Sequence, residues 1–252
     1  MTEQQKLNSV ADASSLRSLV AEILLLLDQE WQPSEWNPSK QPVDELVGTI
    51  LSQNTSDTNT HRAFTSLKSA YPDWQSVIQA NTGDVIETIR SGGLANQKAP
   101  RIQAVLREVV DEGDSDPNAT LLARLERMSP SEAMNWLSSF NGIGPKTAAC
   151  VLLFGVGQPV VPVDTHVHRV ARRIGLIGPR VSAERAHEDL LDIVPDEDSY
   201  RFHMHLIHHG RRTCRSRVPS CNTCVLSGVC DYRRVETATE LSAKQSQGER
   251  AS

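Results

Sequence analysis

The sequence predicts an all-α protein. Apolar residues recur at helical spacing through most of the 252 residues, for example at Leu19, Val20, Ile23, Leu24 and Leu27. No run of alternating apolar and polar residues is long enough to require a β-sheet. Aromatic residues make up only 4% of the chain, so aliphatic side chains fill most apolar positions, which suits packed helices. A chain of this length can form one or two domains with a sizeable core.

The predicted helices are separated by polar turns, and the two ends of the chain are polar. We expect residues 1–15 and the tail 236–252 to be disordered, because they hold few apolar residues for a core. A first helix is predicted over 16–29, and a connection containing Pro and Ser follows over 33–42. Asp57 is the expected N-cap of a later helix. Apolar periodicity and turn residues predict further helices over 43–52, 58–70, 74–80, 82–91, 96–112, 121–128 and 131–140.

A glycine-containing turn follows the last of these helices. Gly142 and Gly144 bracket one apolar residue, and Pro145 stands where a new helix prefers proline. This pattern is typical of a helix–hairpin–helix DNA-binding motif, in which backbone N–H groups bind a phosphate without reading the base sequence. An ordinary helix–helix turn is the alternative, because a lone Gly-x-Gly is a weak signal.

Two ionisable residues follow the turn and are candidates for catalysis. Lys146 is expected one residue into the new helix, where an exposed, non-functional lysine is the common alternative. Asp164 ends a short apolar stretch and begins another helix, so an N-cap role is its alternative. Capping does not exclude catalysis, since a carboxylate can do both.

Four cysteines lie within 17 residues near the C-terminal end, and the remaining 235 residues hold only one more. A disulfide framework is therefore a poor explanation, and a metal centre is a good one. Four thiolates suit either an iron–sulfur cluster or zinc. Zinc sites usually pair two short Cys hooks, whereas here one short hook has longer arms on both sides. We therefore favour a [4Fe–4S] cluster. The four candidate ligands are Cys214, Cys221, Cys224 and Cys230.

The overall charge is −5, which argues against a protein that coats nucleic acid non-specifically. The positive charge is unevenly placed, because residues 165–235 contain twelve arginines and no lysine. Arg212 and Arg215 belong to a group of arginines beside the first cysteine, and the arginine side chain suits forked contacts to phosphate. A solvated face with ion pairs is the alternative interpretation.

With these motifs in this order, the chain resembles the helix–hairpin–helix DNA glycosylases, above all the endonuclease III branch, over about residues 42–233. The resemblance implies that Lys146 is the nucleophile, that Asp164 is the second catalytic residue, and that the four cysteines bind a [4Fe–4S] cluster. Adenine glycosylases of the family usually carry serine at the lysine position, and some thymine-mismatch enzymes carry tyrosine. The stretch His209-Gly210-Arg211 is also similar to the family.

The resemblance implies a two-lobed, all-α helix–hairpin–helix glycosylase fold with a cluster loop. A six-helix lobe would span 42–155, and a cluster lobe would combine 16–41 with 156–235. DNA would lie between the lobes, where Lys146 and Asp164 would meet.

Two loops that touch the lesion in the family depart from the family pattern. The first family loop reads Leu-Ser-x-Gln, but here Asn54 stands at the glutamine position. The second reads Gly-Leu-Tyr-Asn, but here the tyrosine is replaced by Ala95, while Leu94 keeps the apolar wedge. The candidate DNA-binding residues are Gly142, Gly144, Asn54, Leu94, Arg212 and Arg215.

The implied function is a bifunctional DNA glycosylase/AP lyase that excises oxidised pyrimidines and cleaves abasic sites in base excision repair. Its partner would be double-stranded DNA with damaged bases or abasic sites, bound by a monomer. A thymine or uracil mismatch glycosylase and a non-catalytic, redox-sensing DNA-binding protein are the alternatives. No secretion signal is visible and the apolar run 23–27 is too short to cross a bilayer, so we expect no membrane association. A cytoplasmic, nucleoid-associated location is expected if the source is bacterial.

Overall fold

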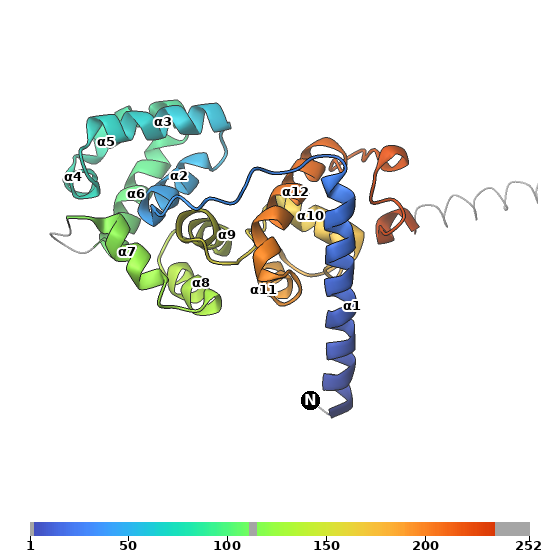
Figure 1. Cartoon of the computed structure of the whole chain (residues 1–252). Coiled ribbons are helices and arrows are strands. Elements are labelled where there is room, and N and C mark those ends of the chain that lie inside the picture. The colour runs from blue at the N-terminus through green and yellow to red at the C-terminus, as the bar shows by residue number, and fades with distance from the viewer. Residues whose placement is uncertain (1–2, 111–114, 235–252) are drawn as a thin grey trace, which may run out of the picture. The chain divides into compact units, whose positions relative to one another are not determined.

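The computed structural model describes residues 3–110 and 115–234, with side chains from residue 13 onward. Within these ranges the chain forms helices and no β-strand, which confirms the all-α prediction (Figure 1). The chain divides into two compact units. The terminal unit comprises Met1–Trp36 and Val163–Ser252, and the central unit comprises Asn37–Pro162. No helix among the described residues has the length and apolar character that crossing a bilayer requires.

The described part of the central unit contains eight α-helices rather than the six expected for that lobe. Two short helices, α4 and α5, are separate because each has its own cap. Asp73 accepts a hydrogen bond from the Ser76 N–H at 2.7 Å, and Asn81 accepts one from the Gly83 N–H at 2.7 Å. The helices are α2 (Pro42–Ser52), α3 (Asp57–Ala70), α4 (Trp74–Gln79), α5 (Thr82–Thr88), α6 (Ala95–Val109), α7 (Pro117–Leu125), α8 (Pro130–Ser138) and α9 (Pro145–Cys150).

Helix α2 forms the centre of the core of the central unit. Its apolar residues Val43, Leu46, Val47 and Ile50 are fully buried, and it packs against α3, α7, α9 and the π-helical segment η2 (Val151–Val156) that continues α9. A 3₁₀ turn, η1 (Arg90–Gly92), joins α5 to α6. The N-cap of α3 is Ser56, which accepts from the Asn59 N–H, rather than the expected Asp57. Ser56 precedes Asp57 by one residue, and from there its hydroxyl reaches an N–H group of the first turn that has no partner within the helix.

The terminal unit is built from the first helix and the last third of the chain. Its elements are α1 (Glu3–Asp28), α10 (Thr165–Ile174), α11 (Ala183–Ile193), η3 (Asp196–Asp198), α12 (Ser199–Arg212) and η4 (Cys221–Thr223). Helix α12 packs against α1 and α10, and α1 also packs against α11. The apolar side chains Val20, Ile23 and Leu24 of α1 are buried together with Phe202 and Leu206 of α12. Sequence-distant segments therefore share one core.

The N-terminal segment differs from the prediction, because α1 begins at Glu3 and not at residue 16. Disorder over 1–15 was therefore wrong for the backbone from Glu3 onward. The segment is polar, but it contains no Gly or Pro and is rich in Gln, Ala and Ser, so nothing stops the helix from extending. The predicted disordered tail, 236–252, lies outside the described residues.

The boundaries between the two units differ from the predicted ones. The predicted boundaries lay at 41/42 and 155/156, whereas the observed ones lie at 36/37 and 162/163. The connection before α2 belongs to the central unit because its backbone binds there. The Ser39 N–H donates to the Phe154 carbonyl at 2.7 Å, and Lys40 Nζ donates to the Val156 carbonyl at 2.6 Å. Gln158 likewise donates to the carbonyls of Leu125 and Met128. The central unit therefore begins a few residues before α2 and ends a few residues after η2.

Candidate active site and metal centre

The predicted hairpin lies between α8 and α9 in the central unit. Ser129 and Glu132 form a capping box that starts α8. After that helix ends, the Ile143 N–H donates to the Phe140 carbonyl at 3.1 Å, and Gly142 adopts a φ of +94°. A side chain at Gly142 would be strained in this left-handed conformation. The turn geometry therefore requires glycine at Gly142.

Gly144 serves a different purpose from Gly142. Its backbone is extended, with φ −88° and ψ 170°, and a Cβ atom added there would meet nothing within 4 Å. The conformation at Gly144 therefore does not require glycine. Gly144 is the N-cap of α9, and because it has no side chain, nothing covers the start of the helix, where Pro145 occupies the first turn. Gly144 is exposed, and the first N–H groups of a helix have no partner within the helix, so they are available to a ligand.

Lys146 is the second residue of α9 and is half-buried. The next four residues, 147–150, are buried, so the helix itself is fixed by packing. Within the described part of the central unit, the Lys146 ammonium makes no hydrogen bond or ion pair. The side chain is thus held at its base by a packed helix, while its amine has no partner in the described part of this unit.

Asp164 is the N-cap of α10, as the sequence predicted. Its Oδ1 accepts hydrogen bonds from the N–H groups of His166 and Val167, both at 2.8 Å. Oδ2 accepts none within the described part of the terminal unit. The cap fixes the orientation of the carboxylate and leaves one oxygen for another partner.

The backbone that leads into Asp164 is also held. The Val163 N–H donates to His187 Nε2 at 3.1 Å, and His187 Nδ1 lies 2.8 Å from the Ala183 carbonyl. These two bonds require a neutral ring that carries its proton on Nδ1. Burial lowers the pKa of His187 below its ordinary value, which agrees with this assignment.

Lys146 and Asp164 belong to different units, so their meeting stays a prediction. The other predicted DNA contacts also divide between the units. Asn54 and Leu94 are exposed residues of the central unit, and Arg212 and Arg215 are exposed residues of the terminal unit. Within the described residues neither arginine forms an ion pair, whereas Arg185 and Arg201 of the same unit do.

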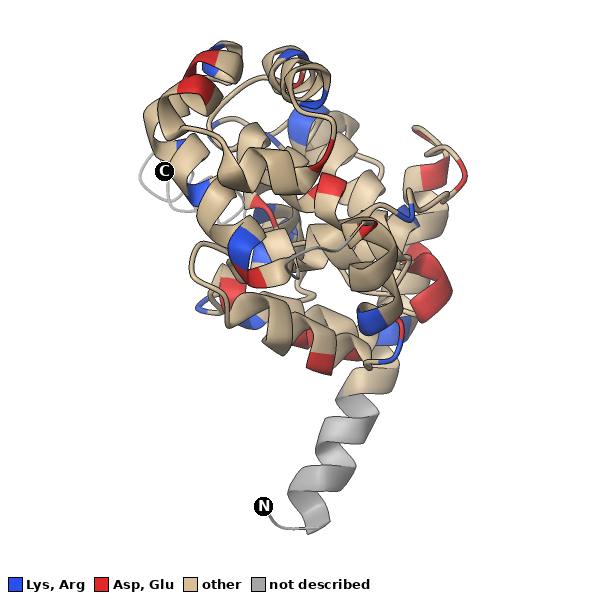
Figure 2. Ribbon diagram, turned by 90° about the vertical axis from the view of Figure 1, so that its left-hand side faces the viewer, with Lys and Arg blue, Asp and Glu red and all other residues tan. Residues whose placement is uncertain are grey.

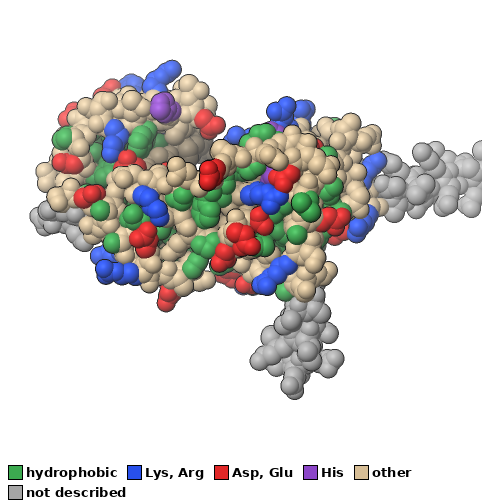
Figure 3. Space-filling model, in the orientation of Figure 1, with side chains coloured by type: hydrophobic (Ala, Val, Ile, Leu, Met, Phe, Trp, Pro, Cys, Tyr) green, Lys and Arg blue, Asp and Glu red, His purple; other side chains and the backbone are tan. Residues whose placement is uncertain are grey.

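Charges of both signs share the same helices, as Figure 2 shows. The face drawn in Figure 3 likewise mixes basic and acidic side chains, with no broad field of one sign. The solvated face with ion pairs therefore describes much of the arginine-rich region, and the DNA-binding role of Arg212 and Arg215 stays a prediction.

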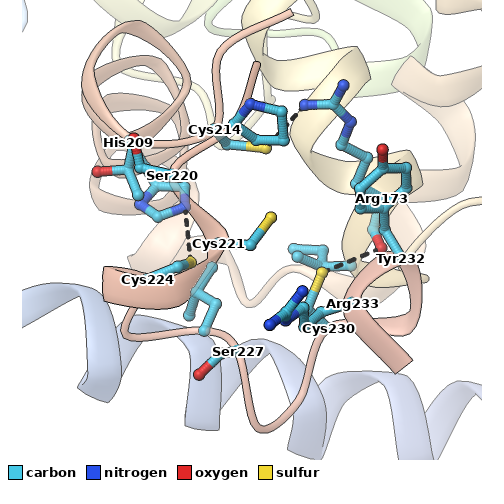
Figure 4. A pocket seen from close by; sticks show the side chains of 14 residues that line it. Arg173, His209, Cys214, Ser220, Cys221, Cys224, Ser227, Cys230, Tyr232 and Arg233 are labelled. Atoms are coloured by element: carbon cyan, nitrogen blue, oxygen red, sulfur yellow. Dashed lines mark hydrogen bonds between the residues drawn. The ribbon is translucent and has the colours of Figure 1, made fainter. Parts of the chain in front are cut away.

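The four predicted cysteine ligands line one cavity of the terminal unit (Figure 4). Cys214 follows α12, Cys221 and Cys224 flank η4, and Cys230 follows the next turn. All four are half-buried and none forms a disulfide. The sequence thus identified side chains that the fold brings together.

Four thiols that line one pocket are a donor set that suits an iron–sulfur cluster or a zinc ion. Among the described residues, no three His, Cys, Asp or Glu side chains converge on a single metal-ion position. Burial raises the pKa of Cys224 to about 11 and also raises the pKa of Cys230. Burial thus favours the protonated form of these two thiols, and metal binding would have to displace their protons.

Hydrogen-bonding groups surround the sulfur atoms. Arg173 Nη1 lies 3.3 Å from Cys214 Sγ, and His209 Nε2 lies 3.6 Å from Cys224 Sγ. His209 is buried, and its Nδ1 lies 3.1 Å from a carboxylate oxygen of Glu30. The cavity therefore has an outer layer of partners that orients its ligands. The sequence interpretation missed Glu30, because nothing in its local pattern marks it.

Two arginines of α10 fasten the helix of Asp164 to the cysteine segment. Arg169 donates to the carbonyls of Gly210 and Cys214 at 2.8 and 3.0 Å, and Arg173 donates to those of Arg215 and Ser216. Gly210 allows the close approach, because a Cβ there would lie 3.0 Å from His166 Cβ. The cysteine cavity and the Asp164 helix are thus parts of one scaffold.

Comparison with known proteins agrees with this arrangement. Residues 47–196 match the family model described as HhH-GPD superfamily base excision DNA repair protein. The chain is 32% identical over 219 residues to an endonuclease III of Synechocystis sp., covering 86% of this chain and 94% of that protein.

Two solved structures show the same fold. A trapped endonuclease III–DNA covalent intermediate has a TM-score of 0.64 and 23% identity, covering 94% of this chain and 100% of that one. A thermostable thymine-DNA glycosylase has a TM-score of 0.65 and 19% identity, covering 88% of this chain and 98% of that one. The chain therefore belongs to the HhH-GPD superfamily of base excision DNA repair proteins.

Proposed function

We propose that the chain is a DNA glycosylase/AP lyase that excises oxidised pyrimidines and cleaves abasic sites by β-elimination. The observation that carries this proposal is Lys146, whose amine has no partner among the described residues of its unit and which follows directly after the turn Gly142–Gly144 on a packed helix. Membership of the superfamily and the endonuclease III relative support the glycosylase/AP lyase role in base excision repair. The oxidised-pyrimidine substrate rests on the resemblance to the endonuclease III branch.

The proposed chemistry begins when the damaged nucleotide leaves the duplex stack. The neutral Lys146 amine attacks the sugar C1′, and the glycosidic bond breaks so that its electron pair leaves with the base, which takes up a proton. The sugar ring then opens to a Schiff base with Lys146. Loss of a proton from C2′ expels the 3′ phosphate, and water releases the enzyme. The step needs no oxidant or reductant.

Asp164 would act through the oxygen that the helix cap leaves open. Positive charge develops on the sugar as the base departs, and a carboxylate held in a fixed orientation stabilises that charge without reorganisation. The hairpin would hold the DNA backbone through the N–H groups at the start of α9, which fixes the register of the strand and not its sequence. A single copy of the chain contains all of these groups, so we propose a monomer on double-stranded DNA.

We propose that Cys214, Cys221, Cys224 and Cys230 bind a [4Fe–4S] cluster. Once bound, such a cluster cross-links its segment, and the proposed reaction needs no electron from it. The segment in turn holds the Asp164 helix through Arg169 and Arg173. Arg212 and Arg215 lie beside the first ligand, so an ordered segment would present both to phosphate.

Two other functions remain to be separated by experiment. A thymine or uracil mismatch glycosylase would share the fold, and the nearly equal TM-scores to both enzyme types show that fold does not discriminate. Lys146 favours lyase chemistry, because a monofunctional glycosylase can use water as the nucleophile. A non-catalytic redox-sensing DNA-binding protein would need neither Lys146 nor Asp164.

A panel of duplexes tests the proposal. Each duplex carries thymine glycol, 5-hydroxycytosine, a T:G or U:G mismatch, or an abasic site. We expect strand cleavage at oxidised pyrimidines and abasic sites, together with an adduct trapped by borohydride. Base release at mismatches without cleavage would favour the mismatch enzyme. Binding to every duplex without base release would favour the non-catalytic protein.

A further inference from the structure

We propose that Lys98 is a positioning residue that ties together the two loops that meet the damaged base pair. The proposal rests on the proposed function and adds a residue that neither loop contains. Lys98 lies on α6, and its side chain is only 2% exposed. Its Nζ donates to the Leu51 carbonyl at 2.6 Å and to the Gly92 carbonyl at 2.8 Å.

Each carbonyl stands at the root of one of the two loops. Leu51 and Gly92 are buried, whereas Asn54 and Leu94, two or three residues later, are exposed. One ammonium therefore bridges the last buried residue before each exposed loop. Movement of either root breaks a hydrogen bond to the same charged group.

Both loops contain backbone that must be held in place. Asn54 has a φ of +54° and Leu94 a φ of +51°, and Lys40 is the only other described residue besides glycine with positive φ. The left-handed region is unfavourable for leucine and easily adopted by asparagine, so Leu94 in particular needs surroundings that fix its backbone. A left-handed residue in each loop, next to a shared clamp, indicates that the loop geometry is specified.

A buried lysine is an expensive way to fill space. Burial disfavours the charged amine and lowers the pKa of Lys98, while the two carbonyls favour the charged form. An unbranched apolar side chain could fill the same volume without that cost. A second residue of α6 contacts the loop that contains Asn54, because Arg101 Nη1 donates to Gln53 Oε1 at 2.8 Å. The polar contacts of α6 on this side are thus directed at the loops.

The clamp predicts that Asn54 and Leu94 act as a unit. Extruding a base from the duplex needs an apolar wedge and a group that fills the vacated space, and both must be in register. Cleavage at an abasic site needs no base to be extruded. Loss of the clamp should therefore slow base excision more than abasic-site cleavage.

The chain offers a matched control on the same helix. Gln103 is 1% exposed, and its Nε2 donates to the carbonyls of Val77 and Ala80, both at 2.9 Å. It clamps segments around α4 and α5 that carry no proposed DNA contact. Lys98→Met and Gln103→Met each remove a buried double donor, so both should lower thermal stability. Only Lys98→Met should alter the loops.

The test compares both variants with the wild type at a temperature where all are folded. Single-turnover rates are measured on a thymine glycol duplex and on an abasic duplex. For Lys98→Met we expect base excision to fall about tenfold or more and abasic cleavage to change by less than about threefold. For Gln103→Met the ratio of the two rates should stay within about twofold of wild type. Equal losses on both substrates in Lys98→Met would overturn the proposal.

Hydrogen exchange supplies a readout that does not depend on catalysis. Amides of residues 52–56 and 93–95 should exchange faster in Lys98→Met and not in Gln103→Met. Unchanged exchange in Lys98→Met would overturn the clamp even if activity fell. Should Lys98→Met not fold, Lys98→Gln, whose shorter amide cannot span both carbonyls, takes its place with the same expected exchange pattern. A wild type without any glycosylase activity would refute the proposed function, while the exchange comparison would still decide the clamp.

Discussion

The hairpin of the central unit and the cysteine cavity of the terminal unit are held in different ways. The hairpin is built by local backbone rules: a capping box before α8, a left-handed glycine in the turn, and buried residues after Lys146. The cavity is built by segments far apart in the sequence, and burial raises the pKa of two of its half-buried thiols, Cys224 and Cys230. The hairpin is thus fixed by contacts within the protein, whereas the cysteine cavity presents four thiols that a metal centre could cross-link.

This difference separates chemistry from support. The group proposed to attack DNA lies where the protein alone fixes the geometry. The groups proposed to bind the cluster lie where they order Arg212, Arg215 and the Asp164 helix. Damage to the first region should stop the reaction and leave the fold intact. Damage to the second should destabilise the terminal unit and lower activity only through that loss of order.

The largest effect is expected from Lys146→Gln. The change removes the nucleophile from a half-buried position with no partner in its unit, so cleavage should fall by at least about 10³-fold. The melting temperature should stay close to that of the wild type. Cleavage kinetics and calorimetry measure both quantities, and Lys68→Gln, an exposed lysine of the same unit, is the control. A variant that unfolds would contradict the separation of chemistry from support.

Cys221→Ser should instead lower the iron content and the stability of the terminal unit. It removes one ligand, so we expect little iron in the purified protein and a destabilised terminal unit. Proteolysis with identification of the fragments should show the terminal unit cut first while the central unit persists. Full iron content in this variant would remove Cys221 from the ligand set, and uniform proteolysis of both units would contradict the comparison.

Asp164 permits a finer test, because two substitutions divide its roles. Asp164→Asn keeps an oxygen for the N-cap but loses the charge, so we expect turnover to fall about 10²-fold with little change in stability. Asp164→Ala loses both, and should add a stability loss of about 1 kcal/mol. Denaturant titrations and single-turnover rates distinguish the two. Equal stability of the variants would mean that the cap contributes nothing.

A smaller effect is expected from the arginines beside the cysteine cavity. Replacing Arg212 and Arg215 by alanine should weaken binding about tenfold and reduce the salt dependence by about one to two phosphate contacts. Lesion-containing and undamaged duplexes should lose affinity alike. Arg185→Ala, which removes an arginine already paired with Glu188 and Asp189, is the control. A double variant with an unchanged salt slope would place the phosphate contacts elsewhere.

The smallest effect concerns His187 and pH. Its pKa is lowered in the folded protein, so the unfolded chain takes up a proton first as pH falls below about 6.5. The contribution of His187 to stability is therefore complete above that pH and is lost below it. His187→Gln should flatten the fall in unfolding free energy between pH 7.5 and 5.5 by up to about 1 kcal/mol. Urea titrations at both pH values test this, and an unchanged slope would contradict it.

The same contrast explains what the sequence could predict. The hairpin, Lys146 and the four cysteines are local patterns, so their residues could be named from composition and spacing. The partners of those residues could not, because they are distant or belong to the backbone. Glu30 meets His209 across 179 positions, and Lys98 binds carbonyls that any residue could supply. The extension of α1 was missed because a polar segment without Gly or Pro has no signal that separates helix from disorder.

Lys146 is proposed to form the covalent bond to the sugar C1′, and peptide mapping of the trapped adduct tests this role. Wild-type protein is incubated with a thymine glycol duplex and borohydride, digested with protease and nuclease, and analysed by mass spectrometry. We expect one peptide modified by the reduced sugar, with the modification at Lys146. A modification at any other amine would show that Lys146 is not the nucleophile, as would base release from the lesion with no adduct at all.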